Sequence, residues 1–146
     1  MAYLIDTNCF IRLAEPNSPN RNPVLSALKN LHSSGETLCY TPQIAAEFWN
    51  VCTRPNTVRG GLGLSVESTE RKVKLIEKHF RLLPDNLRTF VEWRRLVAEL
   101  KIKGVQVYDA RIAASMITHN ISHLLTLNES DFHRYSQITV VDPTQI

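Results

Sequence analysis

The sequence predicts an α/β fold in which short parallel strands alternate with helices that cover the sheet. Short apolar segments such as Ala2–Ile5 and Thr37–Tyr40 are typical of buried strands, and segments with a helical apolar period separate them. The 146 residues, 43% hydrophobic and 21% charged, have the size and composition of one globular domain. Because no linker divides the chain, we expect a single domain over residues 1–146.

The N-terminal elements follow from local signals. The strand Ala2–Ile5 ends at Asp6-Thr7-Asn8, since these residues favour turns and helix caps, and a helix is expected from Cys9. A loop rich in proline and asparagine comes next. Pro23 suits a first helical position, and the second helix ends at Gly35.

The middle of the chain repeats this alternation. After the strand Thr37–Tyr40, the pair Thr41-Pro42 combines a cap with a proline and predicts a helix start. A glycine-containing loop, Thr53–Ser65, leads into another helix. A short extended piece, Arg81–Leu83, follows that helix.

The C-terminal part contains a longer amphipathic helix over Leu87–Ile102, which Gly104 ends. We expect an extended stretch at Val105–Tyr108 and a helix that opens at Asp109 and runs to Thr118. The last predicted elements are two strands, His123–Leu127 and Ile138–Val141.

Charge is distributed unevenly along the chain. The formal net charge is +3, but the segment Arg54–Lys103 holds 12 basic and 6 acidic residues and is +6, while the remainder has 5 basic and 8 acidic residues and is −3. A basic segment can attract a polyanion such as nucleic acid, and it can equally be a solvated helix surface. The asymmetry therefore permits a nucleic-acid partner without identifying one.

Membrane and secretory classes are not expected. No apolar run approaches the roughly 18 residues of a membrane span, and the N-terminus lacks the cationic and apolar stretches of a signal peptide. The three cysteines at 9, 39 and 52 form no CxxC motif, so we expect reduced thiols in a cytoplasmic protein.

Four acids stand out because of their surroundings. Glu47 lies on an apolar helix face, Asp109 precedes apolar helical neighbours, and Asp6 and Asp131 follow predicted strands. Each also has an ordinary structural interpretation. Asp6 and Asp109 can be helix caps, Glu47 can sit at the rim of the core, and Asp131 can be a solvated loop acid.

Parallel strands place their C-terminal ends at one edge of the sheet, where ligands of open α/β folds bind. Carboxylates gathered there would repel one another unless cations neutralise them, and Mg²⁺ or Mn²⁺ takes oxygen ligands. Such a cluster can activate water and stabilise charge on a phosphoryl group. Together with a basic approach surface, this chemistry favours phosphodiester hydrolysis.

Four segments taken in order resemble the motifs of PIN-domain ribonucleases. Leu4-Ile5-Asp6-Thr7-Asn8 resembles the opening motif, and Glu47, within Ile44–Asn50, resembles the second acid. Asp109–Ala114 and Leu125–Phe132 resemble the third and fourth motifs. The order, spacing and total length match over essentially the whole chain.

The resemblance implies a Rossmann-like three-layer α/β/α PIN domain with a central, mostly parallel sheet. It implies cleavage of an RNA substrate that depends on Mg²⁺ or Mn²⁺. Small single-domain members are commonly the toxin of a VapBC-type toxin–antitoxin pair. The resemblance therefore also implies a small antitoxin partner and a homodimer.

The resemblance also implies roles for individual residues. Asp6 and Asp109 would be the principal metal ligands, Glu47 would bind metal or orient water, and Asp131 would support a second metal. Supporting positions are Thr7, Asn8 and Asn128. Asn128 stands where the family often has an acid, and an asparagine supplies a carbonyl ligand without charge.

Some further assignments stay open at the level of sequence. Arg54 and Arg59 can meet phosphates or lie in a solvated loop, and Trp49 and Trp93 can stack on bases or belong to the core. An alternative function is a non-catalytic PIN-fold module that binds RNA or protein, which the asparagine in the fourth motif permits. A phosphotransfer domain is disfavoured because no second Asp adjoins Asp6 and no Lys follows Lys103.

Overall fold

The computed structural model describes residues 1–146 and is built on a five-stranded sheet of order β3-β2-β1-β4-β5. Every neighbouring pair of strands is parallel, which confirms the predicted fold class. The strands are β1 (Ala2–Ile5), β2 (Thr37–Tyr40), β3 (Arg81–Leu82), β4 (His123–Leu125) and β5 (Thr139–Val141).

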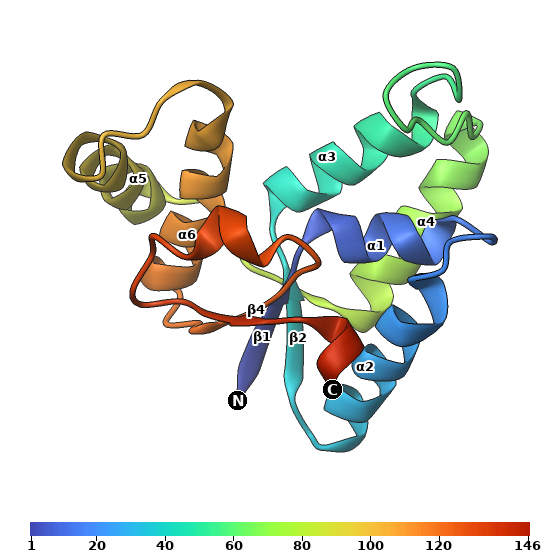
Figure 1. The fold of residues 1–146 in the computed structure, drawn as a ribbon, viewed down its shortest axis with the longest axis horizontal. Helices are drawn as coiled ribbons and strands as arrows, with labels where there is room; N and C mark the ends of the chain where they lie inside the picture. The colour runs from blue at the N-terminus through green and yellow to red at the C-terminus, as the bar shows by residue number, and fades with distance from the viewer.

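Six α-helices and three short 3₁₀ helices connect and cover the strands (Figure 1). The α-helices are α1 (Thr7–Ala14), α2 (Arg21–Ser33), α3 (Pro42–Thr53), α4 (Val66–His79), α5 (Leu87–Glu99) and α6 (Val107–Thr118). The 3₁₀ helices are η1 (Gly104–Gln106), η2 (Glu129–Phe132) and η3 (Pro143–Gln145).

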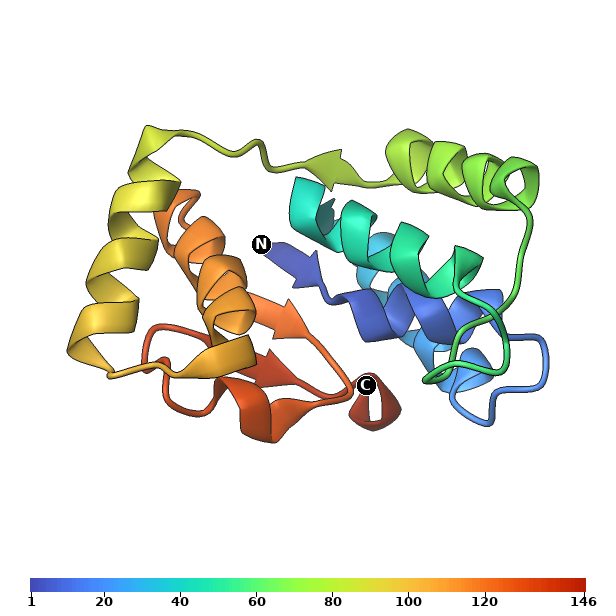
Figure 2. The same cartoon turned by 90° about the horizontal axis from the view of Figure 1, so that it is seen from above.

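The connectivity explains the three layers. From β1 the chain moves outward to β2 and β3, and it then crosses back to β4 and β5 on the other side of β1. Because parallel crossovers are right-handed, this reversal of direction places α5 and α6 on the opposite face of the sheet from α1–α4. Figures 1 and 2 show these two groups of helices on either side of the strands.

The reversal creates a switch point between β1 and β4, where ligands of doubly wound sheets bind. Ile5 and Leu125 are register partners, so the next residues, Asp6 and Thr126, leave the two strands side by side. The backbone amide of Asp6 donates to the carbonyl of Leu125 at 3.0 Å and holds this junction closed.

One continuous apolar core lies beneath the junction. Leu4, Ile5, Leu124 and Leu125 are fully buried in it, and helices from both faces contribute to the same cluster. Burying such side chains stabilises the fold by about 1.5–3 kcal/mol each. The ends of β1 and β4 are therefore anchored in the apolar core.

Several predicted boundaries differ from the structure, and the largest error concerns Val105–Tyr108. This stretch is not extended, because Gly104 adopts φ +59° and turns the chain directly into η1 and then α6. Asp109 consequently lies in the first turn of α6 and is not its N-cap, which is Gln106. The prediction that α6 opens at Asp109 is wrong by two residues.

Smaller differences occur at three other ends. α1 begins at Thr7 with Asp6 as its N-cap, and α2 begins at Arg21, so Pro23 lies inside the first turn, where a proline is tolerated. α5 ends at Glu99 rather than Ile102, as Lys101 takes a left-handed φ of 52°.

The cysteines agree with the expectation of reduced thiols. Cys9, Cys39 and Cys52 are free and buried in the core. No helix combines the length and the apolar character that crossing a bilayer requires.

Candidate functional site

The candidate site is built around Asp6, directly after the central strand. Its side chain is only 8% exposed, and its Oδ1 accepts a hydrogen bond of 2.7 Å from the backbone amide of Thr7 at the start of α1. The two interpretations of Asp6, as a helix cap and as a site residue, are thus compatible. Its Oδ2 accepts a second bond, of 2.8 Å, from the hydroxyl of Thr126.

Thr126 is a functional candidate that the sequence reasoning missed. It is fully buried, and its Oγ1 also accepts bonds from Asn8 Nδ2 at 3.0 Å and from the Asn128 amide at 3.1 Å. Asn8 completes the network, because its Oδ1 accepts from the Leu127 amide at 3.1 Å. The sequence reasoning placed Thr126 inside the strand His123–Leu127, so the end of β4 at Leu125 was needed to bring its hydroxyl into view.

This network also explains why β4 is shorter than predicted. The amides of Leu127 and Asn128 donate to side chains of the network and not to a neighbouring strand. The strand therefore ends at Leu125, and the following residues turn into η2 (Glu129–Phe132) beside the site.

Glu47 approaches from the other side, on α3. The helix begins after β2 because Thr41 caps it, with its Oγ1 accepting from the Ile44 amide at 3.2 Å. The Glu47 side chain is half-buried, and Oε2 accepts a 2.7 Å bond from the Thr7 hydroxyl. Oε1 accepts a 2.7 Å bond from Gln43 Nε2, so Glu47 is neither buried without partners nor paired with an arginine.

Asp109 and Asp131 complete the group of acids. Asp109 is half-buried in the first turn of α6, and Asp131 is exposed on η2. Burial, with the charges of Asp6, Asp131 and Glu47 as smaller causes, raises the pKa of Asp109 to about 6. The four acids therefore lie within electrostatic reach of one another at the end of the strands.

The pKa of Asp6 shifts in the same direction. Burial is the largest cause and raises it to about 6, against the lowering effect of the hydrogen bonds from Thr126 and Thr7. The charges of Glu47 and Asp131 add to the increase. A carboxylate held in this way is one whose charge a cation would stabilise.

The four acids offer carboxylate oxygens, which are the ligands that a hard divalent cation prefers. In the arrangement described, no three Asp, Glu, His or Cys side chains come close enough together to hold one ion. A cation bound here would accordingly keep water among its ligands, as Mg²⁺ usually does. Asn128 is exposed and its side chain makes no hydrogen bond, so its carbonyl oxygen is free.

The predicted phosphate contacts lie farther away. Arg54 follows the last residue of α3, about 10 Å along the helix axis from Glu47. It donates to the backbone oxygen of Arg59 within the same loop, and neither arginine is among the causes that shift the pKa of Asp6 or Asp109. Arg134, which the sequence reasoning did not select, does lower the pKa of Asp109 by its charge.

Packing accounts for Trp93. Trp93 is half-buried against the core, and its indole Nε1 donates to the carbonyl of Val107 at 2.8 Å. This bond ties α5 to the start of α6, just before Asp109. Trp49 is also half-buried.

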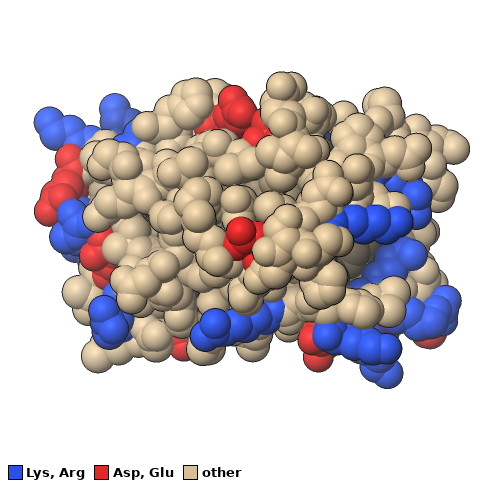
Figure 3. All heavy atoms as spheres, turned by 90° about the horizontal axis from the view of Figure 1, so that it is seen from below, with Lys and Arg blue, Asp and Glu red and all other residues tan.

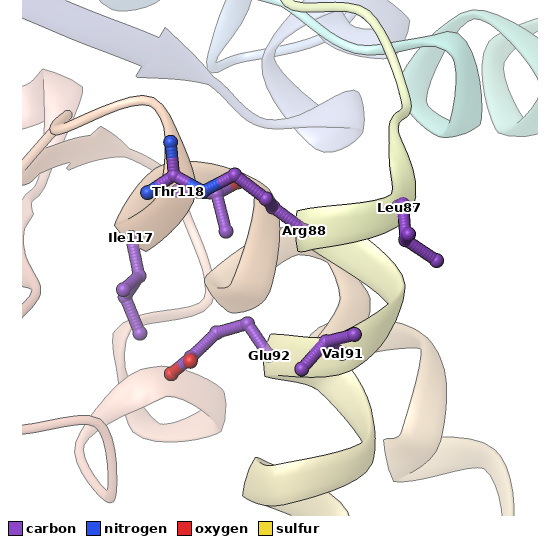
Figure 4. A pocket seen from close by; sticks show the side chains of 6 residues that line it. All are labelled: Leu87, Arg88, Val91, Glu92, Ile117 and Thr118. Atoms are coloured by element: carbon purple, nitrogen blue, oxygen red, sulfur yellow. The ribbon is translucent and has the colours of Figure 1, made fainter.

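One cavity lies away from the acids. It has a volume of about 310 Å³ and opens between α5 and the end of α6, lined by Leu87, Arg88, Val91, Glu92, Ile117 and Thr118 (Figure 4). None of the four acids borders it. The acids and this cavity are therefore separate features of the molecule.

Solved structures share this fold. VapBC2 from Rickettsia felis, bound to a DNA fragment from its promoter, matches at 18% identity and TM-score 0.71 over 97% of this chain and 98% of that one. VapBC-1 from nontypeable Haemophilus influenzae matches at 21% identity and TM-score 0.70 over 99% of each chain. VapC20 from Mycobacterium tuberculosis, a toxin that cleaves the sarcin-ricin loop, matches at 15% identity and TM-score 0.56, over 84% of this chain and 86% of that one.

The sequence comparison decides the family. No curated protein matches this chain in sequence. The family model of the PIN domain matches residues 3–138, which include all four acids and the strands β1 to β4 apart from Ala2, and end just before β5. The chain belongs to the PIN domain family.

Proposed function

We propose that this protein is a divalent-cation-dependent endoribonuclease and the toxin of a type II toxin–antitoxin pair. The observation that carries the proposal is the gathering of Asp6, Glu47, Asp109 and Asp131 at the switch point, where they raise the pKa of Asp6 and Asp109. Four carboxylates that oppose one another's ionisation are costly unless they serve to bind a cation.

Each residue has a defined part in this proposal. Asp6 and Asp109 hold the cation, Asp131 supports a second one beside the substrate, and Asn128 offers a neutral oxygen. When bound, Mg²⁺ or Mn²⁺ supplies an activated water and neutralises charge on the phosphate. Thr7, Asn8 and Thr126 keep Asp6 in place through their hydrogen bonds.

Glu47 is proposed to bind metal or to orient the attacking water. Each of its oxygens accepts one hydrogen bond, from Thr7 or Gln43, and so retains a lone pair for a further donor. Arg134, whose charge acts on Asp109, is placed to attract the phosphate backbone. Arg54 and Arg59 would meet RNA only beyond the scissile bond.

We infer the RNA substrate and the antitoxin partner from the solved structures that share the fold. The solved structures that share the fold include VapBC complexes and a toxin that cleaves the sarcin-ricin loop, which supports an RNA substrate and a small antitoxin. A small DNA-binding protein encoded directly upstream would support the antitoxin, and a solitary gene would favour a housekeeping nuclease.

Cleavage of total RNA by metal-stripped protein, with and without Mn²⁺, tests the function. We expect mapped cleavage sites only with Mn²⁺, and none in Asp6→Asn or Asp109→Asn. Asp85→Asn, which alters an exposed acid on the connection to α5, is the matched control and should cleave normally. Metal-independent cleavage, or full activity in both site variants, would sink the proposal.

A second candidate is an RNA- or protein-binding module without turnover. The lack of three acids close enough to hold one ion, together with the uncharged Asn128, favours it. This alternative predicts RNA binding that survives Asp6→Asn and no cleavage with any divalent metal.

A further inference from the structure

Glu47 and Asp109 reach the site from two helices that otherwise pack elsewhere. α3 packs mainly on α1 and α4, whereas α6 packs mainly on α5. Gln43, one turn before Glu47, makes the only side-chain hydrogen bond between α3 and α6. Its Nε2 donates at 3.0 Å to the carbonyl of Tyr108, the residue next to Asp109.

The same amide group also holds Glu47. Gln43 Nε2 donates to Glu47 Oε1 at 2.7 Å, so both amide protons are used. Because a carboxylate and a carbonyl are both acceptors, only the NH₂ end of the glutamine can face them, which settles its orientation. With Thr7 on Oε2, the Glu47 carboxylate is held from α1 and from α3.

Holding this side chain has a physical consequence. An unrestrained glutamate on a helix samples several rotamers, and ordering it when a ligand binds costs free energy. A hydrogen bond that orders it beforehand removes part of that cost. Residues that orient ligands in this way typically contribute about 10-fold to 100-fold to metal affinity or activity.

We propose that Gln43 is a positioning residue that fixes the direction of the Glu47 carboxylate and its spacing from Asp109. The inference rests on the proposed function, because it assigns Gln43 to the cation and RNA chemistry of that site. Gln43 acts through Glu47 and does not itself touch the reacting atoms.

Gln43→Met tests this, since methionine keeps the length of the side chain but donates no hydrogen bond. We expect Mn²⁺ binding, measured by titration calorimetry, to weaken by about 10-fold to 100-fold. The kcat for RNA cleavage should fall by a similar factor with KM little changed. Thermal unfolding without metal should hardly move, because the side chain is only half-buried. Gln137→Met, at an exposed glutamine without a side-chain hydrogen bond, is the control.

A double-mutant cycle separates positioning from a general structural role. If Gln43 acts through Glu47, then Gln43→Met should change Mn²⁺ affinity less than about 2-fold in a Glu47→Gln background. Additive losses, or wild-type affinity and kcat in Gln43→Met, overturn the inference while the proposed function stands. A wild-type protein that neither binds Mn²⁺ nor cleaves RNA overturns both. Gln43→Ala, also compatible with a helix, replaces the methionine variant if that one fails to fold.

Discussion

At the scale of single residues, the site depends on a buried carboxylate that serves two purposes. Asp6 caps α1 through Oδ1 and receives the Thr126 hydroxyl on Oδ2, while it remains 8% exposed. This cap stabilises the ionised carboxylate in the folded protein even when no ligand is bound. Burial nevertheless leaves that charge costly, which makes the residue sensitive to pH.

The first prediction concerns pH. The pKa of Asp6 is about 6, above the ordinary 3.8, so the folded state binds this proton more tightly than the unfolded state. The associated stability is therefore present below about pH 4 and is lost as pH rises through 6. We expect Asp6→Asn to be more stable than wild type at pH 7.5, by up to about 3 kcal/mol, and the gain to shrink at pH 4.

Urea unfolding in the presence of a chelator measures this difference. Asp85→Asn, which removes one exposed carboxylate, controls for the change in net charge. An equal difference between wild type and Asp6→Asn at the two pH values would contradict the prediction.

The second prediction concerns Thr126. Thr126→Val keeps the shape of the side chain but removes the donor to Asp6 and the acceptor for Asn8 and the Asn128 amide. Because buried polar partners lose their hydrogen bonds, we expect about 1–3 kcal/mol of destabilisation. Thermal or urea unfolding measures it, with the exposed Thr57→Val as control, and a change below about 0.5 kcal/mol would show that the network is dispensable.

At the scale of elements, the loop between α3 and α4 is a packed unit and not a flexible arm. The amides of Leu62, Gly63 and Leu64 donate to the carbonyls of Val51, Arg54 and Cys52. Gly61 lies so close to the carbonyls of Arg54 and Pro55 that a Cβ atom would overlap them. The loop therefore depends on a glycine for close approach of two backbone segments.

The third prediction follows from this contact. Gly61→Ala should destabilise the protein more than Gly60→Ala, which meets open space and costs only the roughly 1–2 kcal/mol of a left-handed backbone at φ +70°. The overlap at Gly61 is with backbone and cannot be relieved by a side-chain rotation. Denaturant midpoints of the two variants give the order, and a smaller loss for Gly61→Ala would refute the packing argument.

At the scale of the whole molecule, the basic segment divides into two. α4 and α5 lie at opposite ends of the structure, so the excess of Lys and Arg does not form one surface (Figures 1 and 2). Figure 3, which looks at the end where the strands begin, shows basic side chains toward both sides and a largely uncharged centre. The two basic regions lie toward opposite ends of the molecule, on either side of the sheet.

The fourth prediction concerns the expected homodimer. α5 exposes Leu87, Phe90 and Val91, at 77%, 56% and 57% exposed, next to the cavity of Figure 4. We propose that this face meets the same face of a second copy, because a two-fold contact would bury these exposed apolar side chains.

Sedimentation velocity tests the dimer. Val91→Glu should shift the protein toward the monomer without loss of thermal stability, since the side chain is exposed. Val66→Glu, at a valine that is 56% exposed on α4, should leave the mass unchanged. A monomeric wild type, or a dimer unaffected by Val91→Glu, would exclude this interface.

The sequence by itself determined the fold class and the order of elements, and it predicted the four acids as candidate site residues. The spacing of apolar residues and the capping residues are local properties of the sequence. The prediction was therefore correct for the strands Ala2–Ile5 and Thr37–Tyr40 and for the start of α3 at Thr41-Pro42. Element boundaries that depend on distant contacts were not predicted correctly. β4 stops at Leu125 because the Leu127 amide donates to the distant Asn8 side chain and the Asn128 amide donates to the Thr126 hydroxyl of the same network.

Only the tertiary structure decided which polar groups meet. The parallel register of β1 and β4 places Asp6 beside Thr126, which lies 120 residues later in the chain. The reversal of strand order puts α3 and α6 on opposite sides of the switch point, so that Gln43 reaches Tyr108. The residue types indicate which chemistry a site can perform. The distances between its side chains are set only when the chain packs around its core.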